Sequence, residues 1–341
     1  MELRETGRFY PWPMKMYIDG EHMKAIVTGG AGFIGSHLVD KLMEMGWNVK
    51  VIDNLSQGRI EYLEKWMDNP RFSFVKMDLK EHDEVLEEVK DCDVVFHLAA
   101  YPEVRAGIER PDHVYKENVE ITFNILEAIR MNGIPHLVFT SSSTVYGDAK
   151  VMPTPEDYSP MEPISIYGAS KLACEALIMG YSHTFKFKSL ILRLANIVGP
   201  RLTHGVIYDF INKLKKDPRK LEILGDGTQR KSYLHVYDCV KAILHLYEVH
   251  KRKRELIEIY NVGSMDWITV REIAEIVVRT MGLREVEFYF TGGVEGGRGW
   301  IGDVKYMLLD ISKAMREGWK PSMNSREAVE ATAREMVREL L

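Results

Sequence analysis

Cysteine is scarce in this chain of 341 residues. Cys92, Cys174 and Cys239 are isolated and odd in number, which argues against a disulfide framework or a metal site and favours a reducing, cytoplasmic compartment. No apolar run is long enough to span a bilayer, and the first residues lack the continuous apolar core of an export signal. The formal net charge of −5 gives no electrostatic reason to expect nucleic acid or a membrane surface as a partner.

The chain shows instead a regular alternation of two patterns. From Met23 to about Asn196, short β-branched runs alternate with longer amphipathic stretches such as Val114–Met131, which predict helices. The predicted strands are Ala25–Thr28, Val49–Ile52, Phe72–Lys76, Val94–Leu98, Leu137–Ser141 and Leu190–Leu194. Because these strands are apolar on both faces, they indicate an α/β fold with a doubly wound parallel sheet.

The pattern changes after Pro200, where loops become longer and richer in glycine. The run Tyr233–Tyr247 followed by Glu258–Val262 predicts a helix and a strand that return to the first sheet. Further helices are predicted over Val206–Lys216, Val270–Met281 and Ser325–Leu341. We therefore expect three parts: an N-terminal appendage or tag at residues 1–22, a sheet domain at 23–199 plus 233–262, and a smaller, mixed α/β domain at 200–232 plus 263–341.

A glycine-rich turn, Thr28-Gly29-Gly30-Ala31-Gly32-Phe33-Ile34-Gly35, follows the first predicted strand and opens a helix. Gly29 permits the sharp turn, Gly32 lets the backbone approach a pyrophosphate, and Gly35 lets helix and strand pack closely. The N–H groups of the helix N-terminus then face the phosphates. Asp53 ends the next strand, where a carboxylate binds the ribose 2′-hydroxyl and repels a 2′-phosphate. The sequence therefore predicts a Rossmann-type site for NAD.

A tyrosine and a lysine, Tyr167 and Lys171, lie four residues apart in a predicted helix and so share one face. A free tyrosine is a poor base, because its pKa is near 10. A nearby ammonium and the positive nicotinamide ring favour tyrosinate, which can take a proton from a sugar hydroxyl. Ser142 follows a strand at the edge where such sheets bind ligands, and its hydroxyl can hydrogen-bond the reacting oxygen.

These motifs together resemble the extended short-chain dehydrogenase/reductase family, and within it the NAD-dependent epimerases and dehydratases. The chain is similar from Met23 onward, in particular to the archaeal-type UDP-glucose 4-epimerases. The resemblance implies Ser142, Tyr167 and Lys171 as the catalytic set. It implies that the cofactor is bound by Gly29, Gly32, Phe33, Ile34, Gly35, Asp53, Asn54, Ser56, Asp78, Leu79, Leu98, Ala99, Ala100, Asn118, Tyr167 and Lys171.

The resemblance also implies a substrate side. It places Ser142 at the sugar, Asn196 and Arg298 near the nucleotide diphosphate, and Val206 on the uridine side. The family often has an arginine where this chain has Lys231, so either Arg230 or Lys231 is expected to meet the diphosphate. Family members commonly pair two helices of each subunit, so a homodimer is also implied.

The reaction is narrowed by two residues beside Ser142. The resemblance implies that nucleotide-sugar 4,6-dehydratases and UDP-glucuronate decarboxylases carry a carboxylate at the position of Ser143 or Thr144. The hydroxyls of Ser143 and Thr144 cannot shuttle a proton as a carboxylate does. This favours a UDP-glucose/UDP-galactose 4-epimerase that uses tightly bound NAD through a 4-keto intermediate. Three alternatives stay open: a 4-epimerase of UDP-GlcNAc/GalNAc or UDP-glucuronate, a net NAD-dependent dehydrogenase of a nucleotide sugar, and a non-catalytic NAD-binding sensor or scaffold.

Overall fold

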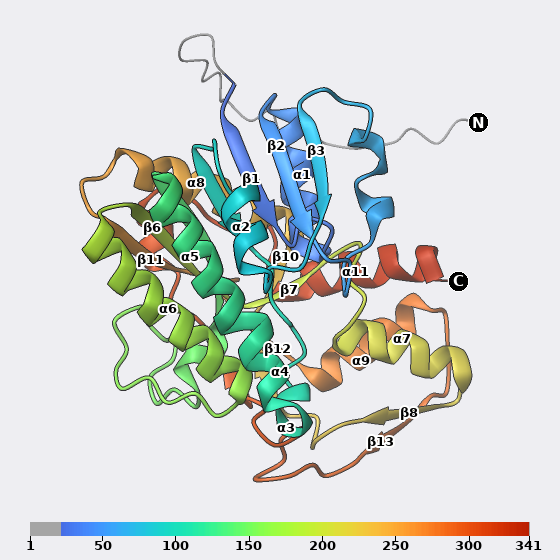
Figure 1. The fold of residues 1–341 in the computed structure, drawn as a ribbon. Coiled ribbons are helices and arrows are strands. Elements are labelled where there is room, and N and C mark those ends of the chain that lie inside the picture. The colour runs from blue at the N-terminus through green and yellow to red at the C-terminus, as the bar shows by residue number, and fades with distance from the viewer. Residues whose placement is uncertain (1–21, 341) are drawn as a thin grey trace.

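The computed structural model describes residues 22–340, so the predicted appendage lies outside the described residues except for His22. Its centre is a parallel sheet of seven strands in the order β11-β6-β5-β4-β1-β2-β3 (Figure 1). The strands are β1 (Lys24–Thr28), β2 (Asn48–Asp53), β3 (Phe72–Lys76), β4 (Val94–His97), β5 (His136–Ser142), β6 (Lys188–Leu194) and β11 (Ile257–Val262). The chain winds outward from β1 in both directions, which opens a crevice at the carboxyl ends of β1 and β4.

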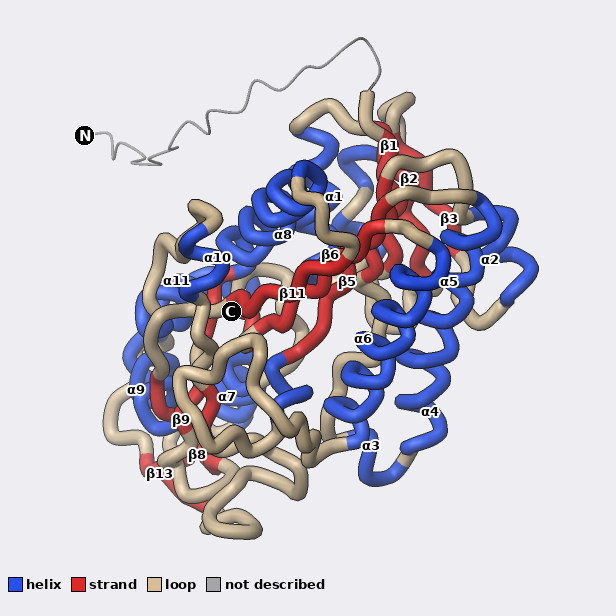
Figure 2. The backbone as a smooth tube through the Cα atoms, turned by 90° about the vertical axis from the view of Figure 1, so that its left-hand side faces the viewer, coloured by secondary structure: helices blue, strands red, loops and turns tan. Residues whose placement is uncertain are grey.

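Helices cover both faces of this sheet (Figure 2). One face carries α1 (Phe33–Glu44) and α8 (Val236–Arg252). The other face carries α2 (His82–Glu88), α5 (Ile121–Asn132) and α6 (Ile166–Phe185). Shorter elements lie between them: α3 (Ala106–Glu109), α4 (Pro111–Tyr115), a π-helical turn at Lys116–Glu120, and 3-10 turns at Ile60–Tyr62, Glu64–Trp66 and Ser143–Tyr146.

Successive strand residues point to opposite cores, which explains why the strand runs are apolar throughout. Val27 of β1 belongs to the core formed with α1 and α8, which includes Leu38. Its neighbour Ile26 belongs to the core formed with α5 and α6, which includes Ile125 and Ile178. The sheet is therefore a buried scaffold, and its carboxyl edge is free to carry chemistry.

A second lobe with its own core lies beyond that edge (Figure 1). It is built on α7 (Val206–Lys216), α9 (Val270–Thr280) and α11 (Ser325–Leu340), with strand β8 (Lys220–Ile223) pairing in parallel with β13 (Glu287–Phe290). The remaining elements are β7 (Asn196–Val198), β9 (Arg230–Lys231), β10 (Tyr233–His235), β12 (Ile268–Thr269), β14 (Tyr306–Met307) and α10 (Ser312–Arg316). No helix within residues 22–340 is long and apolar enough to cross a membrane.

The predicted elements of the sheet are found within two residues of their expected bounds, and two predicted helices need correction. The run Tyr233–Tyr247 is not helical from its start, because Tyr233–His235 pairs in parallel with Asn196–Val198 and the helix begins at Val236. The predicted helix Val114–Met131 contains a π-helical turn where one extra residue is accommodated.

Candidate active site

A cavity of about 510 Å³ runs along the carboxyl edge of the central sheet and into the second lobe. Its lining includes the glycine turn after β1, the ends of β2, β4 and β5, the first turns of α6 and one face of α7. It coincides with the crevice where the strand order of the sheet reverses, which is where such sheets bind ligands.

The glycine turn leaves no room for side chains. Gly29 has a φ of +68°, and a Cβ atom on it would lie 2.7 Å from the backbone nitrogen of Ala99. A Cβ on Gly35 would lie 2.1 Å from the carbonyl oxygen of Gly29, so α1 packs directly on the turn. Helix α1 follows Gly32 without a side-chain cap, which leaves its first N–H groups for a ligand. This cradle fits the pyrophosphate of a dinucleotide.

Polar groups at the end of β2 lie beside this turn. Asp53 is buried, and its carboxylate accepts hydrogen bonds from the N–H groups of Ala31 (3.0 Å) and Leu55 (2.8 Å). Burial raises the pKa of Asp53, although both N–H groups act in the opposite direction. Asn54 donates to Asp78 at 3.4 Å across β2 and β3. The predicted residues of this end all line the cavity: Gly29, Gly32, Phe33, Ile34, Gly35, Asp53, Asn54, Ser56, Asp78 and Leu79.

The wall of the cavity after β4 is formed by Leu98, Ala99 and Ala100. His97 supports this wall from behind, fully buried between the hydroxyls of Thr28 (2.7 Å) and Thr122 (3.0 Å). The Thr122 hydroxyl donates to the carbonyl of Asn118, so it accepts from His97 Nε2 while Nδ1 accepts from Thr28. Burial lowers the pKa of His97 to about 3. The imidazole is therefore neutral at physiological pH and serves as a fixed support.

Asn118 lies behind the cavity lining, in the π-helical turn. Its Oδ1 accepts from the N–H of Tyr101 at 2.8 Å, and its amide donates to Ser170 Oγ at 2.9 Å. Ser170 in turn donates to the carbonyl of Tyr167 at 2.7 Å. Asn118 thus connects the loop after β4 to the helix that carries Tyr167, without reaching the cavity itself.

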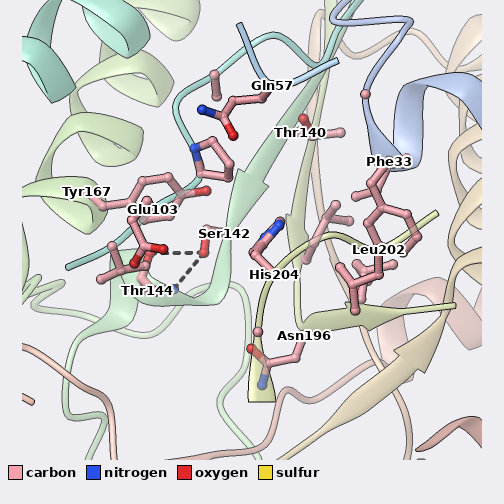
Figure 3. A pocket seen from close by; sticks show the side chains of 18 of the residues that line it. Phe33, Gln57, Glu103, Thr140, Ser142, Thr144, Tyr167, Asn196, Leu202 and His204 are labelled. Atoms are coloured by element: carbon pink, nitrogen blue, oxygen red, sulfur yellow. Dashed lines mark hydrogen bonds between the residues drawn. The ribbon is translucent and has the colours of Figure 1, made fainter. Parts of the chain in front are cut away.

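Ser142, Tyr167 and Lys171 meet in the middle of the cavity, the first two visible in Figure 3. Ser142 ends β5, and its Oγ accepts from the N–H (3.2 Å) and the hydroxyl (2.9 Å) of Thr144. Tyr167 and Lys171 occupy the first turns of α6. The ammonium of Lys171 donates to the carbonyl of Thr140 at 3.0 Å and lies 5.9 Å from the centroid of the Tyr167 ring.

The electrostatics of this trio depend on its burial. Burial raises the pKa of Tyr167 to about 12, and a hydrogen bond with Ser142 acts in the opposite direction. Burial lowers the pKa of Lys171 to about 8. Both shifts favour the neutral forms, so Tyr167 keeps its proton at neutral pH until further positive charge enters the cavity.

The other end of the cavity belongs to the second lobe. Asn196, Val206 and Lys231 line it, as the resemblance implies. Asn196 donates to the carbonyl of Ser232 at 3.3 Å. Lys231 forms an ion pair with the buried carboxylate of Asp303. Figure 3 shows Asn196 and Leu202 on the side of the cavity facing away from Tyr167.

The other two predicted substrate-side cations do not line the cavity. Arg230 is exposed, and its guanidinium lies 5.9 Å from the centroid of the Trp267 ring. Arg298 forms a fork with the carboxylate of Asp148, at 3.0 and 2.6 Å, and donates to the carbonyl of Asp303. Of the three predicted cations, Lys231 alone faces the cavity in the described residues.

The lining residues that the sequence reasoning missed include Glu103, Arg105 and Trp300. Glu103 and Arg105 lie in the loop after β4, and Figure 3 shows Glu103 on the side of Ser142 and Tyr167. Trp300 lies in the long loop between β13 and β14. The position of the first loop at the carboxyl end of a central strand was an available signal. The second loop carries no comparable signal, because its position depends on the packing of the second lobe.

Comparison with known proteins identifies the family of the chain that carries this site. Residues 25–263 match the sequence model of the NAD dependent epimerase/dehydratase family. The chain belongs to this family. NAD is therefore its cofactor, and the protein is an NAD-dependent isomerase of the epimerase type.

Individual relatives cover nearly the whole chain. A putative UDP-glucose 4-epimerase of Methanocaldococcus jannaschii is 36% identical over 89% of this chain and 95% of its own length. A crystal structure of a UDP-galactose 4-epimerase has 47% identity and a TM-score of 0.84, covering 94% of this chain and all of that chain. The UDP-glucuronic acid decarboxylase 1 of Arabidopsis thaliana is 32% identical over 92% of this chain and 69% of its own length. The relatives thus share nucleotide-sugar substrates and differ in reaction.

Proposed function

We propose that the protein is a UDP-glucose/UDP-galactose 4-epimerase. The observation that carries the proposal is the position of Ser142, Tyr167 and Lys171, between the glycine cradle and the second-lobe end of one continuous cavity. A nucleotide sugar whose uridine lies in the second lobe would bring its sugar to this trio, beside the NAD held by the first lobe. The names of the relatives support UDP-sugars of the glucose and galactose type.

Each residue of the trio has a separate task in this proposal. NAD, held by the glycine turn and Asp53, would supply the oxidant that accepts the C4 hydride and gives it back, together with a positive charge. Tyr167 removes the proton from O4 and later returns it. Ser142, whose Oγ already accepts from Thr144, can donate its own proton to O4 and hold it in place. The ammonium of Lys171 favours the tyrosinate, since an opposite charge lowers the pKa of the phenol.

The surroundings of Ser142 support epimerisation over elimination or decarboxylation. Its neighbours Ser143 and Thr144 have hydroxyls, which cannot shuttle a proton as a carboxylate does. The carboxylate of Glu103 is on this side of the cavity, but its Oε1 is held by the backbone N–H and the Nε of Arg105, both at 3.2 Å. The proposed reaction needs only removal and return of the C4 hydrogen, with no net change of redox state.

The test is to incubate the purified protein, without added NAD, separately with UDP-galactose, UDP-GalNAc, UDP-galacturonate and UDP-glucuronate, and to identify products by anion-exchange chromatography and NMR. We expect UDP-galactose to give a mixture with UDP-glucose, without accumulation of NADH. Accumulation of NADH only after NAD is supplied in bulk indicates a net dehydrogenase, and loss of the sugar carboxylate from UDP-glucuronate indicates a decarboxylase. Either result contradicts the proposal.

A variant tests the role of Tyr167 within this reaction. Tyr167→Phe is expected to lower kcat at least about 100-fold, the usual size of a general-base contribution. Tyr289→Phe removes the hydroxyl of an exposed tyrosine outside the cavity and serves as the matched control. A loss below about tenfold for Tyr167→Phe, with NAD retained, contradicts the general-base role.

We also propose a cytoplasmic homodimer. Helices α3 to α6 carry exposed apolar side chains: Ile108, Tyr115, Phe123, Met131, Ile166 and Phe185. Such side chains favour burial against a second copy. A monomeric mass in analytical ultracentrifugation contradicts the dimer. The three cysteines are unpaired, in keeping with a reducing compartment.

A further inference from the structure

Two cations from different lobes meet at one indole ring. The guanidinium carbon of Arg105, in the loop after β4, lies 5.4 Å from the centroid of Trp300. The ammonium of Lys231, in β9, lies 5.5 Å from the same centroid. All three residues line the cavity. The two positive charges repel each other. An anion that lies close to both is attracted by each of them and relieves this repulsion, so the ring marks a favourable place for an anion.

Each cation is held by a carboxylate on its own side of the cavity. Glu103 accepts from the backbone N–H and the Nε of Arg105, and Asp303 pairs with Lys231. These contacts hold the ammonium of Lys231 and the Nε of Arg105 in place. For Arg105 they use only Nε of the guanidinium, and no hydrogen bond or ion pair of its two Nη groups is found within residues 22–340. Their N–H groups form the fork that matches a phosphate.

The remaining cations of the cavity have other positions. Lys171 donates to Thr140 beside the catalytic tyrosine, and Lys213 donates to the carbonyl and the carboxylate of Glu222. Arg298 is occupied by Asp148, outside the lining. A diphosphate that crosses from the second lobe to the sugar position therefore meets the cations at Trp300.

We propose that Arg105 binds the diphosphate of the nucleotide sugar together with Lys231, across the indole of Trp300. This inference rests on the proposed function and adds a binding residue to it. Arg105 supplies the guanidinium fork on one side, in a chain whose β9 position carries a lysine. The loop after β4 thus contributes to both ligands: Leu98 to Ala100 line the NAD end, and Arg105 meets the substrate.

The experiment measures UDP binding by calorimetry with the NAD-loaded protein, because UDP carries the diphosphate without the sugar. Arg105→Ala is expected to weaken UDP binding at least about tenfold, since a charge-assisted bond to phosphate is lost. Arg105→Lys keeps the charge without the fork and should give an intermediate loss. The UDP affinity of Arg105→Ala should also fall less steeply with added salt than that of the wild type.

Arg271→Ala is the matched control. Arg271 also lies over a ring, 5.6 Å from the centroid of Phe290, and its Nε donates to Glu275 at 3.4 Å, but it does not line the cavity. Its UDP affinity should stay within about twofold of the wild type. NAD content and Tm show whether each variant is folded, and if Arg105→Ala loses NAD the comparison is made with Arg105→Lys.

The outcomes separate this inference from the proposed function. Wild-type protein that neither binds UDP nor converts UDP-galactose contradicts the proposed function. Wild-type protein that does both, while Arg105→Ala binds UDP as tightly as Arg271→Ala, overturns the role of Arg105. A loss of affinity for UDP-galactose but not for UDP also overturns it, because Arg105 then contacts the sugar.

Discussion

The two ends of the cavity are built from different kinds of groups, backbone at one end and side chains at the other. The end at the glycine turn, where NAD is expected to bind, is made largely of backbone: Gly29 and Gly35 allow contacts that a single Cβ atom would block, and the N-terminus of α1 has no side-chain cap. The second-lobe end, where we propose that the substrate binds, is made of side chains that are paired within the protein, such as Lys231 with Asp303 and Lys213 with Glu222. The glycine-turn end is therefore a rigid mould of backbone atoms. At the second-lobe end, a bound ligand would replace contacts that these side chains now make within the protein.

This difference predicts how each end responds to substitution. A backbone mould has no alternative arrangement, so one added atom should abolish binding. A network of ion pairs can rearrange, so the loss of one member should change affinity by a small factor. The three predictions below test this contrast, from the largest expected effect to the smallest.

The largest effect is expected for Gly35→Ala. The added Cβ would lie 2.1 Å from the Gly29 carbonyl oxygen, a backbone atom that cannot move without shifting the turn. We expect the purified protein to contain no NAD, and its activity to fall more than about 1000-fold, which corresponds to roughly 4 kcal/mol of lost binding. Release of the cofactor by heating, followed by chromatography, measures the NAD content.

Gly133→Ala is the control for this substitution. Unlike Gly35, Gly133 has a positive φ, of +64°, but a Cβ on it meets nothing within 4 Å. It should cost about 1 kcal/mol of stability through backbone strain and leave the NAD content unchanged. A Gly35→Ala protein with full NAD content contradicts the rigid mould.

An intermediate effect, in opposite directions for activity and stability, is expected for Lys171→Met. Without the ammonium, no positive charge at position 171 opposes the burial that raises the pKa of Tyr167, so kcat at pH 7 should fall about 100-fold and rise again toward alkaline pH. Burial lowers the pKa of Lys171 to about 8, below the value near 10.5 of an exposed lysine. At pH 7 the folded protein therefore holds a buried charge that the unfolded chain holds in water.

The sign of the stability change follows from this difference. Stability of the wild type should rise between pH 8 and about 10.5, since the unfolded chain binds the extra proton there. Lys171→Met removes the penalty and should raise the free energy of unfolding by roughly 3 kcal/mol at pH 7, with a smaller gain near pH 10. Thermal denaturation of both proteins at the two pH values measures it. A lower Tm for the methionine variant at pH 7 contradicts the buried charge.

The same contrast explains how much could be predicted from the sequence. The central sheet and the glycine turn were predictable because strand periodicity and glycine spacing are local features; Phe72–Lys76 was predicted to the residue. The trio Ser142, Tyr167 and Lys171 could be predicted because its positions depend on local features. Ser142 lies at the end of a strand, and Tyr167 and Lys171 are four residues apart on one helix. Arg105 and Trp300 come together through the packing of loops almost 200 residues apart, and no spacing in the chain encodes that contact.

The short strand β10 shows the same limit in the fold. The run Tyr233–Tyr247 has a helical pattern, yet Tyr233–His235 is extended because β7 offers it a parallel partner. Local preference gives way to a tertiary contact in such places. Asn118 is a related case: the resemblance implies that it binds the cofactor, but the π-helical turn directs its amide to Tyr101 and Ser170 behind the cavity.

The smallest effect is expected for Asp148→Ala, which opens the fork around Arg298. The fork joins the loop between β13 and β14 to the turn after β5, and Asp148 is 46% exposed, so its contribution to stability should be below about 1 kcal/mol. The loop carries Trp300 and Asp303, so its loosening should raise KM for UDP-galactose about two- to fivefold with kcat unchanged. Steady-state kinetics at fixed salt measures both values. A lower KM would have a different meaning: Asp148 then competes with the substrate for Arg298, and Arg298 binds the diphosphate as the family resemblance implies.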